Sequence, residues 1–153
     1  MKSQTFLNQV RVYSPRCRAG ALMGLKLTLK PGEKIALNGA VIVNGDRRAS
    51  FVVENQARVL RERDIIQPQE ASTPATRIYF AIMMMYLDDE AGADFRAEYE
   101  ARLEEFTRAV ASPEALKTCA ALAAHVANGE LYKALSVCRD LIDYEKERLT
   151  HVA

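Results

Sequence analysis

Two adjacent arginines, Arg47 and Arg48, follow the turn-forming run Asn44-Gly45-Asp46 and precede a run of apolar residues. If a strand begins here, their side chains point to opposite faces of the sheet. A guanidinium group binds phosphate through a bidentate fork and stacks against unpaired bases. Eight basic residues gather between positions 23 and 66: Lys26, Lys30, Lys34, Arg47, Arg48, Arg58, Arg61 and Arg63. The pattern predicts a surface for an anionic polymer such as single-stranded RNA.

Charge is distributed unevenly along the 153 residues, although the formal net charge is only +1. Residues 1–22 carry a net charge of +4, residues 23–66 of +3 and residues 67–153 of −6. Such asymmetry is typical of a chain whose basic part meets an anionic partner. In the alternative interpretation the basic residues cover a solvated sheet face, and the two arginines pair with Asp46, Glu54 or Glu62, contacts worth about 0–1 kcal/mol.

Signatures of catalysis are missing from the sequence. It contains no phosphate-binding P-loop, no G-x-G-x-x-G fingerprint and no G-x-S-x-G nucleophile elbow. The three cysteines stand apart, and His125 and His151 complete no zinc-ligand spacing with them. We therefore expect a protein that is not an enzyme and that needs no metal or other cofactor. Cys119 and Cys138 fall on apolar helical positions, which predicts buried thiols in a reducing cytoplasm.

The basic residues must be positioned by β-structure. From Leu25 to Lys30 leucines alternate with polar residues, the period of a half-buried strand. Three turn signals follow within about fifteen residues, Pro31-Gly32, Asn38-Gly39 and Asn44-Gly45, and the Asn-Gly pairs favour type I′ hairpins. We expect strands at 25–30, 35–37, 40–43 and 48–54, with a last one at 59–60. Together they predict an antiparallel meander over residues 25–66.

Beyond Pro68 the apolar period becomes 3.6, which predicts about four helices. Thr73 is a good N-cap and Pro74 a good first residue for a helix that runs to Leu87. This helix is apolar nearly all round, so it is either the centre of the fold or an interface. Further helices are expected over 95–110, over 113–127 and from 131 to 149. The predicted fold class is α+β, a β meander followed by a helical bundle.

Three regions follow from these patterns. Residues 1–22 are basic but lack the apolar stretch of a secretory signal, and Met23 stands directly before the first strand. We expect this leader to be disordered or an over-extended gene start. Residues 23–66 form a β module that is the candidate RNA-binding part, and residues 67–153 form a helical region that packs on it. No apolar run reaches the roughly 20 residues of a membrane span.

Several runs of residues resemble the FlbT family of bacterial flagellin regulators. They are L-K-L-T-L-K-P-G-E-K-I-A-L-N-G-A-V-I-V-N-G-D-R-R-A-S, E-N-Q-A-R-V-L-R-E-R-D-I, T-P-A-T-R-I-Y-F-A-I and Y-K-A-L. The resemblance extends from about Met23 to the last helix. It implies binding to the 5′ untranslated region of flagellin messenger RNA, lowered translation and faster decay of that message. It also implies a small partner protein, FlaF, and a role in flagellum assembly.

Two short segments are also similar to CsrA-type RNA regulators. L-T-L-K-P-G-E at 27–33 and V-L-R-E-R-D-I at 59–65 match segments that frame a single-stranded RNA site between two subunits in that family. This similarity implies RNA contacts by Thr28, Lys30 and Arg61, with Leu60 and Glu62 as their neighbours. The chain departs from the pattern at Leu29, where the other family has arginine, so the RNA sequence preference is not transferred. The similarity and the exposed edges of a short meander favour a homodimer.

A second class of function stays open on the sequence. The apolar helix of residues 74–87 could bind a protein partner, FlaF or flagellin itself, through Tyr79, Met83 and Tyr86. Effects on messenger RNA would then be indirect. The alternative reading of the same helix is that it forms the core of the bundle.

Overall fold

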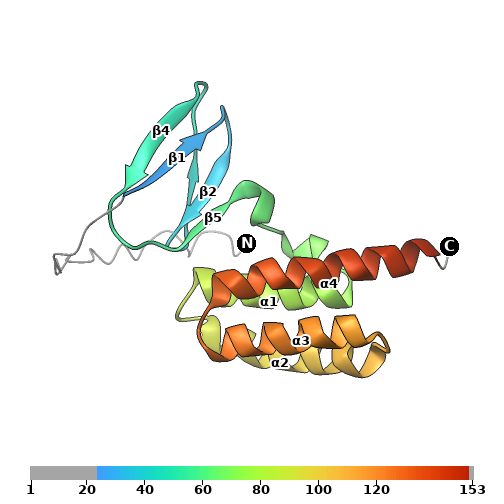
Figure 1. The fold of residues 1–153 in the computed structure, drawn as a ribbon. Helices are drawn as coiled ribbons and strands as arrows, with labels where there is room; N and C mark the ends of the chain where they lie inside the picture. The colour runs from blue at the N-terminus through green and yellow to red at the C-terminus, as the bar shows by residue number, and fades with distance from the viewer. Residues whose placement is uncertain (1–23, 152–153) are drawn as a thin grey trace, which may run out of the picture.

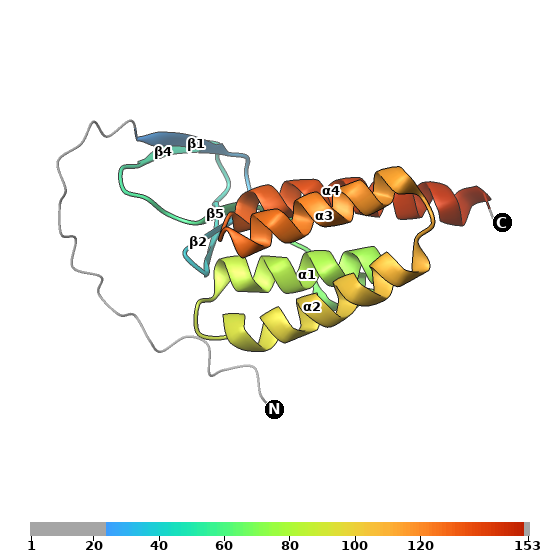
Figure 2. The same cartoon turned by 60° about the horizontal axis from the view of Figure 1, so that its bottom comes forward.

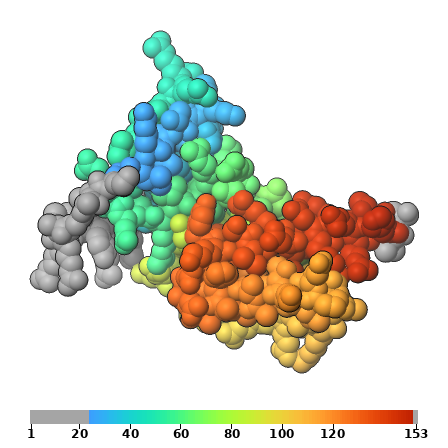
Figure 3. All heavy atoms as spheres, in the orientation of Figure 1, coloured from blue at the N-terminus to red at the C-terminus, as the bar shows by residue number. Residues whose placement is uncertain are grey.

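A computed structural model describes residues 24–151. The strands are β1 (Leu25–Leu29), β2 (Lys34–Leu37), β3 (Ala40–Val43), β4 (Ala49–Val53) and β5 (Val59–Arg61). Two short 3-10 helices, η1 (Glu62–Asp64) and η2 (Pro68–Glu70), lead to α1 (Pro74–Leu87), α2 (Gly92–Ala109), α3 (Pro113–Ala127) and α4 (Leu131–His151). The strands form a lobe at one end of the elongated bundle (Figures 1 and 3). The α+β prediction is confirmed, and the predicted leader lies outside the described residues.

The strands form two small antiparallel sheets. In the first, β1 pairs with β4, from Leu25 opposite Val53 to Leu29 opposite Ala49. In the second, the order is β3-β2-β5. In a simple meander each strand pairs with its neighbour in sequence. Here β1 pairs with β4, and the β2–β3 hairpin stands between them in the sequence. The Pro31-Gly32 turn, with Gly32 at φ +71°, moves the chain from the first sheet to the second.

The two Asn-Gly pairs behave differently. Asn38 and Gly39 have φ values of 50° and 84°, which fits the type I′ hairpin predicted between β2 and β3. The second hairpin prediction is wrong, because Gly45 has no positive φ and β3 and β4 lie in different sheets. The side-chain nitrogen Nδ2 of Asn44 instead donates to the carbonyl oxygens of Leu29, Lys30 and Arg47, at 3.2, 2.7 and 2.9 Å. This side chain fastens the loop after β3 to the end of β1.

A small apolar core fills the space between the sheets. Leu27, Leu29 and Ile35 are buried in it, and Phe51 and Val53 pack against them. The alternation predicted for β1 is therefore confirmed for its second half, although Leu25 at the start of the strand is exposed. Burial of each large aliphatic side chain contributes about 1.5–3 kcal/mol, which allows so small a module to hold its shape.

The larger core joins the β module to the helices. Ala36 of β2 and Leu60 of β5 are buried against residues of α1, the central helix, which packs on both α2 and α4. Thr73 caps α1 by accepting a hydrogen bond from the Thr76 amide, and Pro74 is its first residue, as predicted. The core interpretation of this apolar helix is confirmed. Cys119 and Cys138 are buried free thiols, also as predicted.

The other helices complete a bundle that is open on one side. Ser112 caps α3 by accepting from the Ala115 amide, and Gly129 at φ +74° ends it. α4 packs on both α1 and α3, while α2 and α3 approach each other at few points (Figure 2). The end of α4 extends beyond the bundle, away from the strands (Figures 1 and 2). Between residues 24 and 151 no helix has both the length and the apolarity to cross a membrane.

Gly39 is expected to be the least replaceable turn residue. A Cβ at this position would lie 2.7 Å from the carbonyl oxygen of Leu87, whereas one at Gly32 would meet nothing within 4 Å. Both residues have positive φ, so a larger stability loss at Gly39 than at Gly32 measures the effect of the close approach to α1. We expect Gly39→Ala to lower the free energy of unfolding by about 2–3 kcal/mol and Gly32→Ala by about 1 kcal/mol. Urea unfolding followed by circular dichroism measures both; equal losses would contradict the prediction.

Candidate nucleic-acid interface

A basic groove of about 970 Å³ opens where the two sheets meet. Its lining comes from the end of β1 and the Pro31-Gly32 turn, from the residue before β4, and from the end of β5 with the start of η1. Four of its residues are cationic and two are acidic, so its formal charge is positive. The lining residues are Thr28, Lys30, Pro31, Gly32, Glu33, Arg48, Arg61, Glu62 and Arg63.

Five residues that the sequence nominated for RNA binding meet in the basic groove. They come from three stretches of chain that lie far apart in the sequence. The antiparallel pairing of β1 with β4, and of β2 with β5, brings these stretches together. The five are Thr28, Lys30, Arg48, Arg61 and Arg63.

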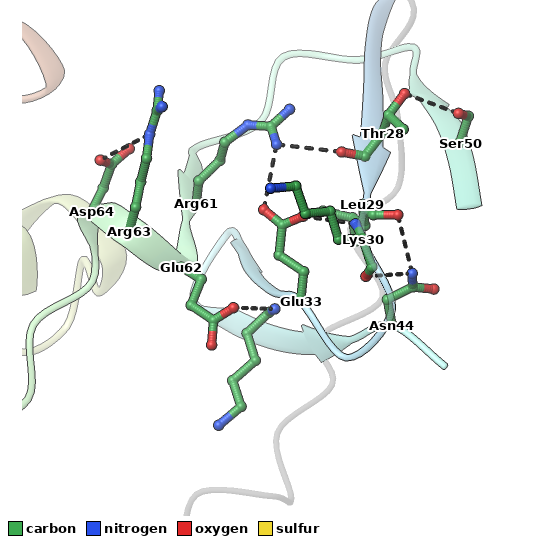
Figure 4. Close-up of polar contacts among 11 residues, drawn as sticks. Thr28, Leu29, Lys30, Glu33, Asn44, Ser50, Arg61, Glu62, Arg63 and Asp64 are labelled. Carbon is green, nitrogen blue, oxygen red and sulfur yellow. Dashed lines mark hydrogen bonds and ion pairs between the residues drawn. The ribbon is translucent and has the colours of Figure 1, made fainter. Parts of the chain in front are cut away.

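Arg61 is oriented across the groove by two contacts (Figure 4). Its Nη1 donates to the carbonyl oxygen of Thr28 at 3.3 Å and lies 3.5 Å from Oε1 of Glu33. The other carboxylate oxygen of Glu33 accepts a hydrogen bond from the Lys30 amide at 2.8 Å. Glu33 therefore fixes both the turn and the guanidinium group, which stays one-third exposed and open to a ligand.

Arg47 and Arg48 are both exposed, but only Arg48 lines the groove. Among residues 24–151 neither guanidinium group has a carboxylate within ion-pair distance, so the alternative pairing with Asp46, Glu54 or Glu62 is not formed. The backbone at Arg47 is held through its carbonyl oxygen by Asn44. The loop is thus anchored while both charged ends point into solvent. Arg48 therefore presents an exposed positive charge to the groove.

Arg63, whose side chain is 80% exposed, also lines the groove. Its Nε lies 3.6 Å from Oδ1 of Asp64, a carboxylate that also receives a hydrogen bond from Arg139 of α4 (Figure 4 shows the first contact). Asp64 is buried, and its backbone carbonyl accepts from the Tyr79 hydroxyl at 2.6 Å. The bundle therefore holds η1, and with it Arg63, at the rim of the groove.

Four nominated residues lie outside the groove. Arg58 forms an ion pair with Asp89 at 2.5 Å and donates to the Tyr86 carbonyl at 3.3 Å, so it ties β5 to the end of α1. Lys26 lies opposite Val52 on the outer face of the first sheet. Lys34 is exposed at the start of β2, and its backbone amide donates to Glu62 at 3.1 Å. The fourth, Arg47, is exposed beside the groove.

Sequence reasoning missed Glu33 and Asn44 as parts of the site, and it named Glu62 only as a neighbour of Arg61. Glu33 was visible only as the residue after a turn, and Glu62 as part of the segment similar to CsrA-type regulators. Their roles depend on pairing between strands that lie about 30 residues apart, which one sequence does not specify. Asn44 was interpreted as a turn former, although its side chain fastens the loop that carries Arg48.

The residues predicted to bind a protein partner lie inside the molecule. Tyr79 and Met83 are each 2% exposed, and Tyr86 is half-buried with its hydroxyl 3.0 Å from the Val59 amide nitrogen. Burial raises the pKa of the Tyr79 hydroxyl, and Arg139 partly offsets this effect. Through their hydroxyl groups Tyr79 and Tyr86 connect α1 to the β module. None of the three forms an open binding surface in this conformation.

An apolar groove of about 440 Å³ lies instead between α2 and α3. We call it the helical groove. It follows from the poor contact between these two helices. Apolar side chains form its floor, and charged residues of α2 form a rim. The main residues are Tyr99, Leu103, Ala123, Val126 and Ala127, with Arg96, Glu100, Glu104 and Arg108 at the edge.

Tyr99 of the helical groove should titrate late. Burial raises the pKa of its hydroxyl from the ordinary 10.0 to about 12. The folded state then keeps a proton that the unfolded state releases above pH 10, so the free energy of unfolding falls as pH rises from about 10 to about 12. We expect Tyr99→Phe to remove part of this fall and to delete the highest step in a spectrophotometric tyrosinate titration. Tyr132→Phe, at an exposed tyrosine of α4, is the control and should leave the highest step in place.

Within residues 24–151, five strands, four α-helices and a basic groove at the sheet junction define an α+β protein with a surface suited to an anionic ligand. The chain belongs to the FlbT family: the family model described as "Flagellar protein FlbT" matches residues 25–149. The prediction from the sequence is confirmed at the level of the family. The relatives below are named as repressors, so the prediction of a protein that is not an enzyme is confirmed by family membership.

The chain is similar over most of its length to several relatives. It is 54% identical over 131 residues to "Flagellum biosynthesis repressor protein FlbT" of Caulobacter vibrioides strain CB 15, a match that covers 86% of this chain and 93% of the relative. A probable FlbT repressor of Caulobacter sp. strain K31 is also 54% identical, over 86% of this chain and all of its own. One of Rhodopseudomonas palustris is 39% identical, over 84% and 99% respectively. No solved structure matches.

Proposed function

We propose that this protein is a cytoplasmic post-transcriptional regulator of flagellum biogenesis that binds the 5′ untranslated region of flagellin messenger RNA in its basic groove. Binding represses translation of the message and promotes its degradation. The observation that carries the proposal is the convergence of Lys30, Arg48, Arg61 and Arg63 on one groove. The names of the relatives, flagellum biosynthesis repressors, support a regulatory role in flagellum synthesis and its repressive direction.

The groove offers different chemistry at different points. Arg48 and Arg63 are exposed at its rim, where they can neutralise phosphates and release counterions. Arg61 is held by Glu33 and Thr28, so its guanidinium plane is ordered before a ligand arrives and can stack on an unpaired base. Such a division between charge contacts and stacking suits single-stranded RNA, whose bases are free to turn toward a protein.

The two acids in the groove favour bases over a bare phosphate chain. One carboxylate oxygen of Glu62 accepts a hydrogen bond from the Lys34 backbone amide (Figure 4), and within residues 24–151 the second oxygen has no hydrogen-bond or ion-pair partner. A carboxylate repels phosphate but accepts hydrogen bonds from the amino groups of bases. The groove therefore supports RNA recognition in which phosphates lie along the arginine rim and a base edge approaches Glu62.

Direct titration tests the proposal. Purified protein, with no FlaF present, is titrated against a fluorescently labelled flagellin leader RNA, and anisotropy is recorded at several salt concentrations. We expect saturable binding at moderate salt that weakens as salt rises, because phosphate contacts release counterions. A duplex DNA of the same length serves as the control and should bind more weakly. Absence of saturable binding to the leader would overturn the proposal.

The helical groove favours a second candidate function, an adaptor that binds a FlaF-type regulator or flagellin. Its apolar floor between α2 and α3 has the shape of a site for an amphipathic helix. The partner would lie there and not on Tyr79, Met83 and Tyr86, which are buried or half-buried. If the leader RNA fails to bind while FlaF or flagellin is captured by the purified protein, the adaptor function takes the place of the first proposal.

A further inference from the structure

The strand β3 forms an open edge of the second sheet. The order β3-β2-β5 places it at the end, and all four of its residues are exposed. Val41, Ile42 and Val43 are 62%, 42% and 58% exposed, an unusual degree of exposure for three consecutive branched apolar residues. Singly exposed apolar side chains need no explanation, whereas a continuous run indicates a contact surface.

The hydrogen-bonding groups of β3 also lack partners on one side. In a two-residue hairpin the residues next to the turn, here Leu37 and Ala40, exchange hydrogen bonds, and every second pair does the same. The backbone N–H of Asn44 donates to the backbone carbonyl of Glu33 at 2.9 Å, which confirms this alternation. The N–H and C=O groups of Val41 and Val43 therefore point away from β2. Within residues 24–151 no strand pairs with them.

This edge has none of the features that normally protect one. Exposed edge strands are usually interrupted by lysine, proline or a bulge. The run from Asn38 to Gly45 contains no charged residue and no proline, and β3 pairs with β2 without a bulge. The unprotected edge is thus confined to a short strand between two Asn-Gly pairs, a length suited to one specific partner strand.

We propose that β3 pairs antiparallel with β3 of a second copy of this chain, around a twofold axis at Ile42. Val41 then lies opposite Val43 of the second copy, and Val43 opposite its Val41. These are the residues whose backbone groups point outward, so each pair gains two hydrogen bonds. The two three-stranded sheets become one continuous sheet, and the exposed valines of both copies cover one another on one face.

A second copy fits this edge better than a different partner because the strand is complementary to itself. In the antiparallel arrangement around a twofold axis, each outward N–H of Val41 and Val43 lies opposite a C=O of the second copy, and each outward C=O opposite an N–H. It also brings no like charges together, since the residues that meet, 39–45 of each copy, are uncharged. β3 does not line the basic groove, so the proposal stands or fails independently of RNA binding.

Paired substitutions test the register. In V41K/V43K, ammonium groups of the two copies lie opposite each other at both pairs, whereas in V41K/V43E each ammonium group faces a carboxylate. Light scattering after size exclusion at micromolar concentration measures the mass. We expect the unmodified full chain to have twice the 17.1 kDa of one chain, V41K/V43K to have the mass of one chain, and V41K/V43E to dimerise. Leu149→Lys replaces an equally exposed leucine of α4 and should leave the dimer intact.

Unchanged circular dichroism shows that each variant still folds. A monomeric unmodified chain would overturn the proposal, including the case in which another segment of the chain covers β3. Equal behaviour of V41K/V43K and V41K/V43E would also overturn it, because only the proposed register makes their charges differ in effect.

Discussion

Replacing Arg48 and Arg63 together by alanine is expected to weaken binding of flagellin leader RNA about a hundredfold at moderate salt. Both side chains lie at the rim of the basic groove, and within the described chain Arg48 has no acidic partner while Arg63 makes only a long contact to Asp64. Each would give a charge-assisted contact to phosphate worth roughly 1.5 kcal/mol, or about tenfold in affinity. Both side chains are exposed and Arg63 makes only one long contact to a buried group, so the loss should appear mainly in affinity and little in stability.

The salt dependence identifies the cause of this loss. For single strands, log affinity falls with log salt by about 0.7 per phosphate neutralised. The double variant should therefore show a slope smaller by about 1.4. Anisotropy titrations at four or more salt concentrations give affinity and slope from the same samples. A weaker affinity with an unchanged slope would mean that the two arginines act without touching phosphate.

Two controls separate position from charge. R77A/R148A removes the same charge from exposed positions on α1 and α4, and it should change affinity little. Arg47→Ala is a closer match to Arg48→Ala, because the two arginines are adjacent and both exposed, yet only Arg48 lines the groove. We expect the loss at Arg48 to be clearly larger. Equal losses at the two positions would mean that overall charge, and not the groove, binds the RNA.

Most helices and strands could be predicted because caps, turn preferences and apolar periods depend only on residues that are close in the sequence. Thr73 and Pro74 start α1 through a cap that needs only the next three residues, and Asn38-Gly39 forms its hairpin through its own φ preferences. The same rules failed at Asn44-Gly45. There the asparagine amide finds carbonyl oxygens at the end of β1, and these contacts outweigh the local turn preference.

The candidate site could be predicted in charge but not in arrangement. A cluster of arginines and lysines is visible in the sequence, whereas the pairing of β1 with β4 decides that Arg48 joins Lys30 while Arg47 does not. Arg58 has the same chemistry as Arg61, yet Asp89, over 30 residues away in sequence, binds it to the bundle. The apolar helix shows the same limit. Its period fits an interface as well as a core, and only its packing against the β module, α2 and α4 decides for the core.

Arg139→Met is expected to destabilise the protein by about 2–3 kcal/mol. Asp64 is 5% exposed and is the one charged residue of the described chain that is buried, and Arg139 donates to its carboxylate. Removing one member of a fully buried ion pair costs about 3–5 kcal/mol, because the other member is left without a partner in a medium of low polarity. The value is reduced here because the Arg139 side chain is 44% exposed and Arg63 stays 3.6 Å from Asp64.

The reverse substitution should cost less. Asp64→Asn leaves Arg139 without its carboxylate, but this exposed guanidinium can be hydrated and its Nη2 still lies 3.4 Å from the Tyr79 hydroxyl. We expect a loss of about 1–2 kcal/mol, and a double variant whose loss is smaller than the sum. Urea unfolding followed by circular dichroism gives the three values. Arg148→Met is the control, since Arg148 is exposed on the same helix and lies 5.3 Å from the centre of the Tyr144 ring.

The same contacts link the bundle to the basic groove, so the loss should also reach the ligand. Asp64 ends η1, the segment that carries Arg63 and directly follows Arg61, and Tyr79 of α1 binds its carbonyl. Arg139 does not line the groove, and its removal deletes no phosphate contact. We therefore expect Arg139→Met to weaken RNA binding several-fold with an unchanged salt slope. R48A/R63A differs from it, because that variant should lower the salt slope as well as the affinity. If Arg139→Met is no more harmful than Arg148→Met in either measurement, the Asp64 contact neither stabilises the fold nor positions the groove.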